Sequence, residues 1–228
     1  MITQIYTAQT VAEALALAEA GVDHVGVTVA DRRLPGEIDL GTGRAIVAAL
    51  RGVATSIALT VDTDPVAVRM MAAALEPDIL HLCGDTALLP PASVADLRAW
   101  LGRRRLDVEL LQAIPITGPQ AVVDARRFAR HVDWLLLDSV TTEVEGIGAA
   151  GVTHDWSISR QIVAESEVPV ILAGGLGPDN VAEAIAAVGP AGVDSLTMTN
   201  RRLPGGGFEK DLAAVERFVD AVSQAANR

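Results

Sequence analysis

Several predicted strands end on side chains that can exchange protons. Asp138 closes the most apolar run of the chain, residues 134–137, and His81 and Cys83 lie at the end of another predicted strand. A carboxyl group in apolar surroundings stays protonated and can act as an acid. A histidine or a cysteine has a pKa near enough to neutrality to act as a base. These residue types predict acid–base chemistry on a small molecule.

In an α/β barrel, active sites lie at the carboxyl ends of the strands. Strand alternation sends His81 and Cys83 to the same side, with Leu82 on the other. Two alternatives stay open, namely a Cys83 that is only a buried structural side chain and an Asp138 that only caps the next loop. The polar residues expected at the strand ends are Tyr6, Thr28, Asp62, His81, Cys83, Gln112, Asp138, Ser139, Thr197 and Asn200.

The loops after the last two strands are predicted to hold a phosphate group. Gly174 and Gly175 follow an apolar strand, and a helix starting at Pro178 directs its N-terminus to the same place. Glycine lets the backbone approach an anion, and the N–H groups of a helix N-terminus bind it. From strand eight, Thr197 and Asn200 are the candidates. The alternative is a tight turn that merely requires glycine.

The pentapeptide Arg-Arg-Leu-Pro-Gly occurs twice, at 32–36 and at 201–205. Both copies follow predicted strands, the second and the eighth. In a barrel these two loops flank strand one, so Arg33 and Arg202 are predicted to present positive charge to an anionic ligand. The alternative is coincidence between two basic turns.

The whole chain, residues 1–228, is predicted to form one α/β domain, a single (β/α)₈ TIM barrel. Short apolar runs alternate with helical segments, which is typical of a parallel sheet buried on both faces. A doubly wound open sheet is the competing arrangement. Strands are expected at 4–6, 24–29, 56–61, 78–83, 107–114, 134–138, 168–173 and 193–198. Helices are expected from 10 to about 21, at 42–50, 64–75, 93–101 and 119–129, from about 155, at 178–188 and at 212–226.

Composition limits the partners. The net charge of −11 and the pI near 4.7 argue against nucleic acid and against an anionic membrane surface. One cysteine permits no intramolecular disulfide, and no His and carboxylate spacing is that of a metal site, so neither metal nor cofactor is expected. His24 and His131 are expected at the surface of the opposite rim. No apolar run approaches a membrane span and no signal segment is evident, which predicts a cytoplasmic location.

Several motifs together resemble the phosphoribosylanthranilate isomerase family. They are the apolar strand and Gly-Gly turn at 172–176 with Pro178 and Asn180, the Leu-Leu-Asp-Ser stretch at 136–139, and the loop from Gly151 to Asp155-Trp156. The resemblance implies an Amadori rearrangement, in which a ribosylamine ring opens and an aldose becomes a ketose. It implies the general acid at Asp138 and substrate contact at Asp155.

The chain also departs from that family. Tyr6 stands where the family has a cysteine base, Gly36 where it has an arginine, and residues 196–198 where it has Ser-Ser-Gly. A phenol with a pKa near 10 is a poor base at neutral pH, so Tyr6, Cys83 and His81 are all candidates. We expect an isomerase, acting as a monomer or homodimer on a phosphorylated sugar or sugar-amine conjugate that differs from the family's substrate. The alternatives are an inactive phosphosugar-binding or regulatory barrel and a lyase or epimerase on another sugar phosphate.

Overall fold

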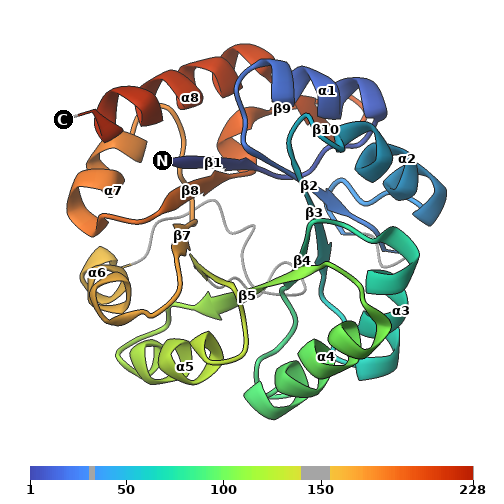
Figure 1. Cartoon of the computed structure of the whole chain (residues 1–228). Helices are drawn as coiled ribbons and strands as arrows, with labels where there is room; N and C mark the ends of the chain where they lie inside the picture. The colour runs from blue at the N-terminus through green and yellow to red at the C-terminus, as the bar shows by residue number, and fades with distance from the viewer. Residues whose placement is uncertain (31–33, 140–154, 228) are drawn as a thin grey trace.

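Eight parallel strands close into a barrel in chain order (Figure 1). The structure is a computed structural model, and it describes residues 1–30, 34–139 and 155–227. The first strand pairs with both the second and the eighth, which excludes the open sheet. The strands are β1 Ile2–Ile5, β2 His24–Thr28, β3 Thr55–Thr60, β4 Ile79–Leu82, β5 Glu109–Pro115, β6 Trp134–Asp138, β7 Val170–Leu172 and β8 Gly192–Ser195.

Within the described residues, eight helices form a ring outside the barrel (Figure 1). Two of these helices begin at the capping residues that the sequence predicted. The Thr10 side chain accepts a hydrogen bond from the backbone of Glu13, and Asp64 caps a helix whose first residue is Pro65. The helices are α1 Val11–Glu19, α2 Leu40–Leu50, α3 Pro65–Leu75, α4 Pro91–Arg104, α5 Gln120–Ala129, α6 Trp156–Glu165, α7 Val181–Val188 and α8 Leu212–Ala226.

Strand alternation divides the core in two. Leu80 and Leu82 of β4 belong to the large cluster between the barrel and the helices, whereas Ile79 and Cys83 belong to a smaller cluster inside the barrel. His81 is on the inner side with them. The prediction that His81 and Cys83 face the same side, with Leu82 on the other, is therefore confirmed. This alternation directs both polar side chains towards the barrel mouth.

The segment after β8 differs from the prediction. The strand ends at Ser195 rather than at residue 198, and Thr197–Thr199 form a 3₁₀ turn, η1. A hairpin follows, with β9 Asn200–Arg202 paired to β10 Phe208–Lys210. The extended run was predicted from apolar alternation, but the Thr199 hydroxyl donates to the carbonyl of Leu196, 3.1 Å away, and closes a turn instead.

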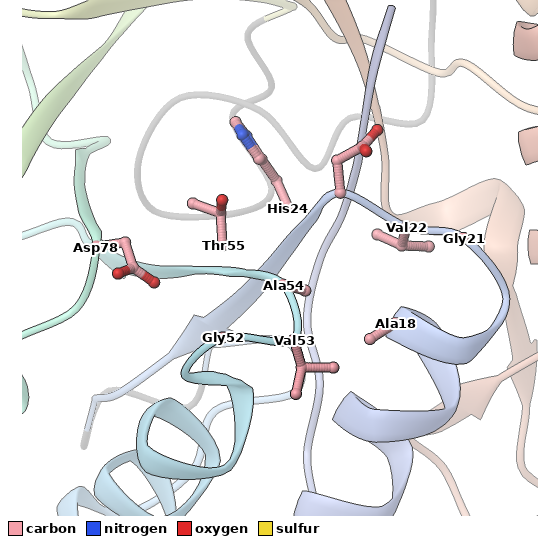
Figure 2. A pocket seen from close by; sticks show the side chains of 10 residues that line it. Ala18, Gly21, Val22, His24, Gly52, Val53, Ala54, Thr55 and Asp78 are labelled. Carbon is pink, nitrogen blue, oxygen red and sulfur yellow. The ribbon is translucent and has the colours of Figure 1, made fainter.

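The amino ends of the strands are held by carboxylates. Asp23 accepts hydrogen bonds from the backbone and hydroxyl of Thr3 at 2.8 and 2.9 Å, and Asp78 binds Ser56 in the same way at 2.7 Å. An open hollow of about 550 Å³ lies here, lined by His24, Thr55 and Asp78 among others (Figure 2). Because both carboxylates bind strands, this face stabilises the barrel and is not the candidate site.

The expectation that His24 lies at the surface is wrong. Its side chain is only 6% exposed, its Nδ1 lies 3.2 Å from Oε1 of Gln4, and its ring packs edge-on against Trp134. Burial lowers its pKa to about 4. His24 is therefore a neutral residue of the barrel interior. It is buried because it is already the first residue of β2 and not part of the loop before that strand.

Candidate active site

A glycine on β2 makes room for Tyr6 at the end of β1. A side chain at Gly26 would collide with the Tyr6 ring, so the ring lies where that side chain would be. Tyr6 is 3% exposed and belongs to the inner cluster of the barrel. The phenol is thus turned into the barrel mouth, towards β4.

Tyr6, His81 and Cys83 form a connected polar group. The Tyr6 hydroxyl lies 2.8 Å from Nδ1 of His81, and the Cys83 Sγ lies 3.2 Å from Nε2 of the same ring. Burial lowers the pKa of His81 to about 3, and it raises the pKa of the Tyr6 phenol and of the Cys83 thiol well above their usual values. All three groups are therefore uncharged at neutral pH and share hydrogen bonds.

Asp138 is a protonated carboxylic acid at the end of β6. Its Oδ1 accepts a hydrogen bond of 2.6 Å from the Ser139 backbone. Burial, followed by the nearby charge of Asp194, raises its pKa to about 8. A carboxyl group that holds its proton at neutral pH can donate it, so the side chain fits the acid role that the sequence predicted.

Asp194 and Lys210 are site residues that the sequence analysis did not select. Asp194 of β8 accepts a hydrogen bond of 3.1 Å from Gln4, and burial raises its pKa to about 7. Lys210 donates to the backbone carbonyl of Tyr6 and to Oδ1 of Asn200, 2.7 Å away, and burial lowers its pKa to about 7. A carboxylate at an inward position of an apolar strand was the available signal for Asp194.

The turn after β7 is bent by glycine and pinned by Asn180. Gly174 and Gly175 have φ values of 93° and 63°, which favour glycine. The Asn180 side chain accepts from the Gly177 backbone at 2.8 Å and donates to the Gly175 carbonyl at 3.0 Å. The amide side chain therefore holds a compact backbone corner directly before α7.

The turn after β8 lies against this corner. A side chain at Gly177 would come within 2.6 Å of Met198 in η1. Thr197, in the same turn, is exposed, whereas the Asn200 oxygen is bound by Lys210. The structure thus brings Thr197 beside the glycine corner, and it gives Asn200 a structural partner.

Gly36, the last residue of the first Arg-Arg-Leu-Pro-Gly copy, meets the hairpin of the second copy beyond the end of β1. Gly36 lies against Thr7 and against the ring of Phe208, which belongs to the hairpin that contains the second copy. Arg202 is exposed on β9, so its side chain can reach a ligand in solution. Arg33 lies outside the described residues. The predicted neighbourhood of the loops is confirmed, and the anion-binding role of the arginines stays a prediction.

Asp155 begins α6. Its side chain accepts a hydrogen bond of 2.9 Å from the Ser157 backbone, which is an N-cap interaction. The residue before it and the rest of the loop from 140 lie outside the described residues. The structure accounts for Asp155 as a cap, and substrate contact by this residue stays a prediction.

Among the described residues, no group of three or more His, Cys, Asp or Glu side chains has the geometry to hold a metal ion. Within the same ranges, no helix is long and apolar enough to cross a membrane.

The chain is a closed (β/α)₈ barrel with an acid–base site at one mouth. That site combines a protonated carboxyl, a Tyr-His-Cys group and a glycine corner. Residues 96–197 match the family described as N-(5'-phosphoribosyl)anthranilate (PRA) isomerase. A relative of that name from Halobacterium salinarum is 36% identical over 203 residues, covering 88% of this chain and 85% of its own length. One from Myxococcus xanthus is 35% identical, covering 92% and 90%. The chain belongs to the PRA isomerase family, and it is an isomerase by that membership.

Solved structures support the fold. The phosphoribosylanthranilate isomerase of Thermotoga maritima superposes with a TM-score of 0.78 at 23% identity, covering 98% of this chain and all of that chain. The corresponding protein from Thermus thermophilus gives a TM-score of 0.77 at 21% identity, covering 98% and 99%.

Proposed function

We propose that this chain isomerises N-(5'-phosphoribosyl)anthranilate by an Amadori rearrangement. The observation that carries the proposal is Asp138, a buried carboxyl at the mouth that keeps its proton up to a pH of about 8. The reaction must begin with a proton delivered to the ring oxygen of the sugar, and a carboxylate could not deliver it.

The rearrangement begins with two proton transfers, one to the ring oxygen and one from carbon 2, and ends with a ketonisation that moves the 2-hydroxyl proton away and protonates carbon 1. Asp138 gives its proton to the ring oxygen, the carbon–oxygen bond breaks, and the nitrogen lone pair forms an iminium ion. A base then removes the proton from carbon 2, which yields the enolamine and, after its ketonisation, the ketose. An acid and a base that lie at the ends of different strands, at the same mouth of the barrel, can carry out the transfer to the ring oxygen and the transfer from carbon 2.

The glycine corner is the proposed place for the substrate phosphate. Gly174 and Gly175 allow close approach of the backbone, and α7 begins at Val181, where the corner ends. Thr197 lies beside the corner and is exposed. We extend the proposal to Arg202 and Asn200, as a charge at the rim and as a support for the turn after β8.

The sequence departures at Tyr6 and Gly36 had suggested a substrate other than the family's. Similarity over most of the chain to relatives of one name gives no support for a different compound. The proposal therefore keeps the family's substrate and assigns the departures to the way the site is built. One Thermotoga maritima relative is described as dimeric and was also solved as monomers. For this chain, a monomer or homodimer and a cytoplasmic location stay proposals.

The direct test is turnover of the proposed substrate by the purified full chain. We expect loss of N-(5'-phosphoribosyl)anthranilate with formation of the ketose product, and none with ribose 5-phosphate, which lacks the nitrogen needed for the iminium ion. Measurement of both reactions by chromatography of substrate and product decides the point. A chain that binds the compound without converting it would instead support the phosphosugar-binding alternative.

Asn180→Asp tests the phosphate corner. The new carboxylate still accepts from the Gly177 backbone, but it loses the donor to Gly175 and adds negative charge. We expect KM to rise about 10-fold or more, equivalent to about 1.4 kcal/mol, with a smaller change in kcat. The matched control is Asp179→Asn, which removes an exposed negative charge next door. An unchanged KM in Asn180→Asp would place the phosphate elsewhere.

A further inference from the structure

The reaction needs a base for the proton on carbon 2, and Tyr6 is a poor one. Its phenol is buried, and the burial together with the charges of Asp194 and Cys83 raises its pKa further above the usual value of 10. Burial raises the pKa of the Cys83 thiol as well, but a phenol has the higher ordinary pKa, so Tyr6 is the harder of the two to deprotonate. The better candidate for the base therefore lies at the end of β4.

At the end of β4 a thiol lies in contact with a histidine. Cys83 faces the inside of the barrel, with its sulfur 3.2 Å from Nε2 of His81. The other ring nitrogen of His81 lies 2.8 Å from the Tyr6 hydroxyl, which fixes the ring between the two strands. A thiol that contacts a histidine oriented by a third group is the arrangement in which cysteine gives up its proton.

We propose that Cys83 removes the proton from carbon 2 of the substrate, that His81 takes the thiol proton as it does so, and that Tyr6 positions His81. The assignment rests on the proposed function and names the base for that same site. It differs in position from the base that the family resemblance implies, because this chain has Tyr6 directly after β1 and carries its one cysteine directly after β4.

The proton transfers balance around the cycle. With His81 protonated on Nδ1, that N–H donates to the Tyr6 oxygen and the bare Nε2 faces the Cys83 thiol. The thiol proton moves to Nε2, the thiolate takes the proton from carbon 2, and the carbon–hydrogen bonding pair becomes the carbon–carbon double bond of the enolamine. Cys83 is then a thiol again. In the ketonisation the thiol gives its proton to carbon 1 and recovers one from His81 Nε2, while the proton of the 2-hydroxyl passes to the Asp138 carboxylate, so that all three groups end as they began.

The surrounding charges explain why the thiolate forms only during the reaction. Besides Tyr6 and His81, the titratable groups near Cys83 are Asp138 and Asp194, and with burial they raise the pKa of the thiol. Lys210 lies beyond them, near Asp194. The iminium ion made by the first step brings a positive charge to the same mouth, and that charge favours a thiolate beside it.

Variants of Cys83 test the assignment. We expect Cys83→Ala to lower kcat by about 10²–10⁴-fold, with KM changed far less, because a base acts in the transition state rather than in binding. Cys83→Ser keeps the size but holds its proton more tightly, so it is also expected to be slow. The control is Leu82→Val, which alters the same strand on its outer face and is expected to keep kcat within about 3-fold.

Tyr6→Phe separates positioning from a structural role. It removes the hydroxyl that orients His81 but keeps the ring beside Gly26. We expect a smaller loss of kcat than in Cys83→Ala together with a changed pH profile of kcat, whereas a purely structural residue would leave the profile where it was. A Tyr6→Phe profile identical to that of the wild type would overturn the role of Tyr6.

Chemical labelling gives a readout that does not depend on any variant folding. Cys83 is the one cysteine of the chain, so methyl methanethiosulfonate can form a single adduct. The probe for protection is reduced 1-(o-carboxyphenylamino)-1-deoxyribulose 5-phosphate, the compound bound to one solved relative. We expect inactivation in proportion to labelling and slower labelling with the probe present. Fully labelled protein that retains turnover, or an active Cys83→Ala, overturns the base alone, whereas a wild type that converts no substrate overturns the proposed function.

Discussion

Replacing Asp138 with asparagine is expected to lower kcat by about 10²–10⁴-fold while the barrel stays folded. Asparagine has the same shape and its oxygen can still accept the hydrogen bond from Ser139, but it has no acidic proton for the sugar ring oxygen. Turnover of N-(5'-phosphoribosyl)anthranilate by the purified variant is the measurement. The matched control is Asp85→Asn in the exposed loop after β4, where the amide oxygen still accepts from Ala87. Turnover in Asp138→Asn equal to that of the control would contradict the acid role.

The pH dependence of the wild type provides a second check on Asp138. The acid works only when protonated, so kcat/KM is expected to fall as the pH rises through about 8, the raised pKa of this carboxyl.

The raised pKa of Asp138 also affects the stability of the fold. The pKa of this carboxyl is raised from 3.8 to about 8 in the folded protein. Its contribution to the free energy of unfolding is therefore fully present below pH 3.8 and is lost as the pH rises through about 8. Asparagine cannot ionise, so above this pH Asp138→Asn is expected to be more stable than the wild type by about 0.5–2 kcal/mol. Urea denaturation at two pH values measures it.

Local signals predicted the barrel because each of them acts over a few residues. Caps such as Thr10 and Asp64 begin helices by satisfying their own N–H groups, and β6 was predicted with its observed bounds because an apolar run is unambiguous. The hairpin β9–β10 was missed because each of its strands is only three residues long and a glycine-rich turn joins them, which leaves no apolar period to detect. Ring closure was expected from the repeated units, and the pairing of β1 with β8 confirms it.

The sequence predicted which side of its strand each candidate side chain faces, but not which side chains meet across the barrel mouth. Alternation places His81 and Cys83 on one side of β4, and the apolar run before Asp138 indicates a desolvated carboxyl. The partners across the mouth were not predictable, since they depend on strand register and stagger around the closed barrel. The Tyr6–His81 hydrogen bond and the bond of Lys210 to the Tyr6 carbonyl both join β1 to distant segments. For the same reason Asp194 appeared only as an interruption of an apolar strand, although its charge helps to raise the pKa of Asp138.

Gly36, which stands where the family resemblance predicts an arginine, is required by the packing around it. Gly36 has a φ of 70°, and a side chain there would meet the Thr7 hydroxyl and come within 2.7 Å of the Phe208 ring. These two neighbours belong to the end of β1 and to the hairpin that carries the second pentapeptide. An arginine at this position therefore cannot be accommodated without moving the chain that follows Tyr6.

Gly36→Arg is accordingly expected to destabilise the fold by about 2–4 kcal/mol, from the strained backbone and the overpacked contact together. It is also expected to lower kcat/KM, because Thr7 directly follows the residue that positions His81. The repeat supplies the matched control. Gly205 ends the second copy of the same pentapeptide, and a side chain there meets nothing within 4 Å, so Gly205→Arg should change the free energy of unfolding by no more than about 0.5 kcal/mol. Urea denaturation of both variants measures the difference. Equal stabilities would mean that the loop at Gly36 yields easily, and a rise in kcat/KM in Gly36→Arg would show that the arginine can still reach the substrate from this position.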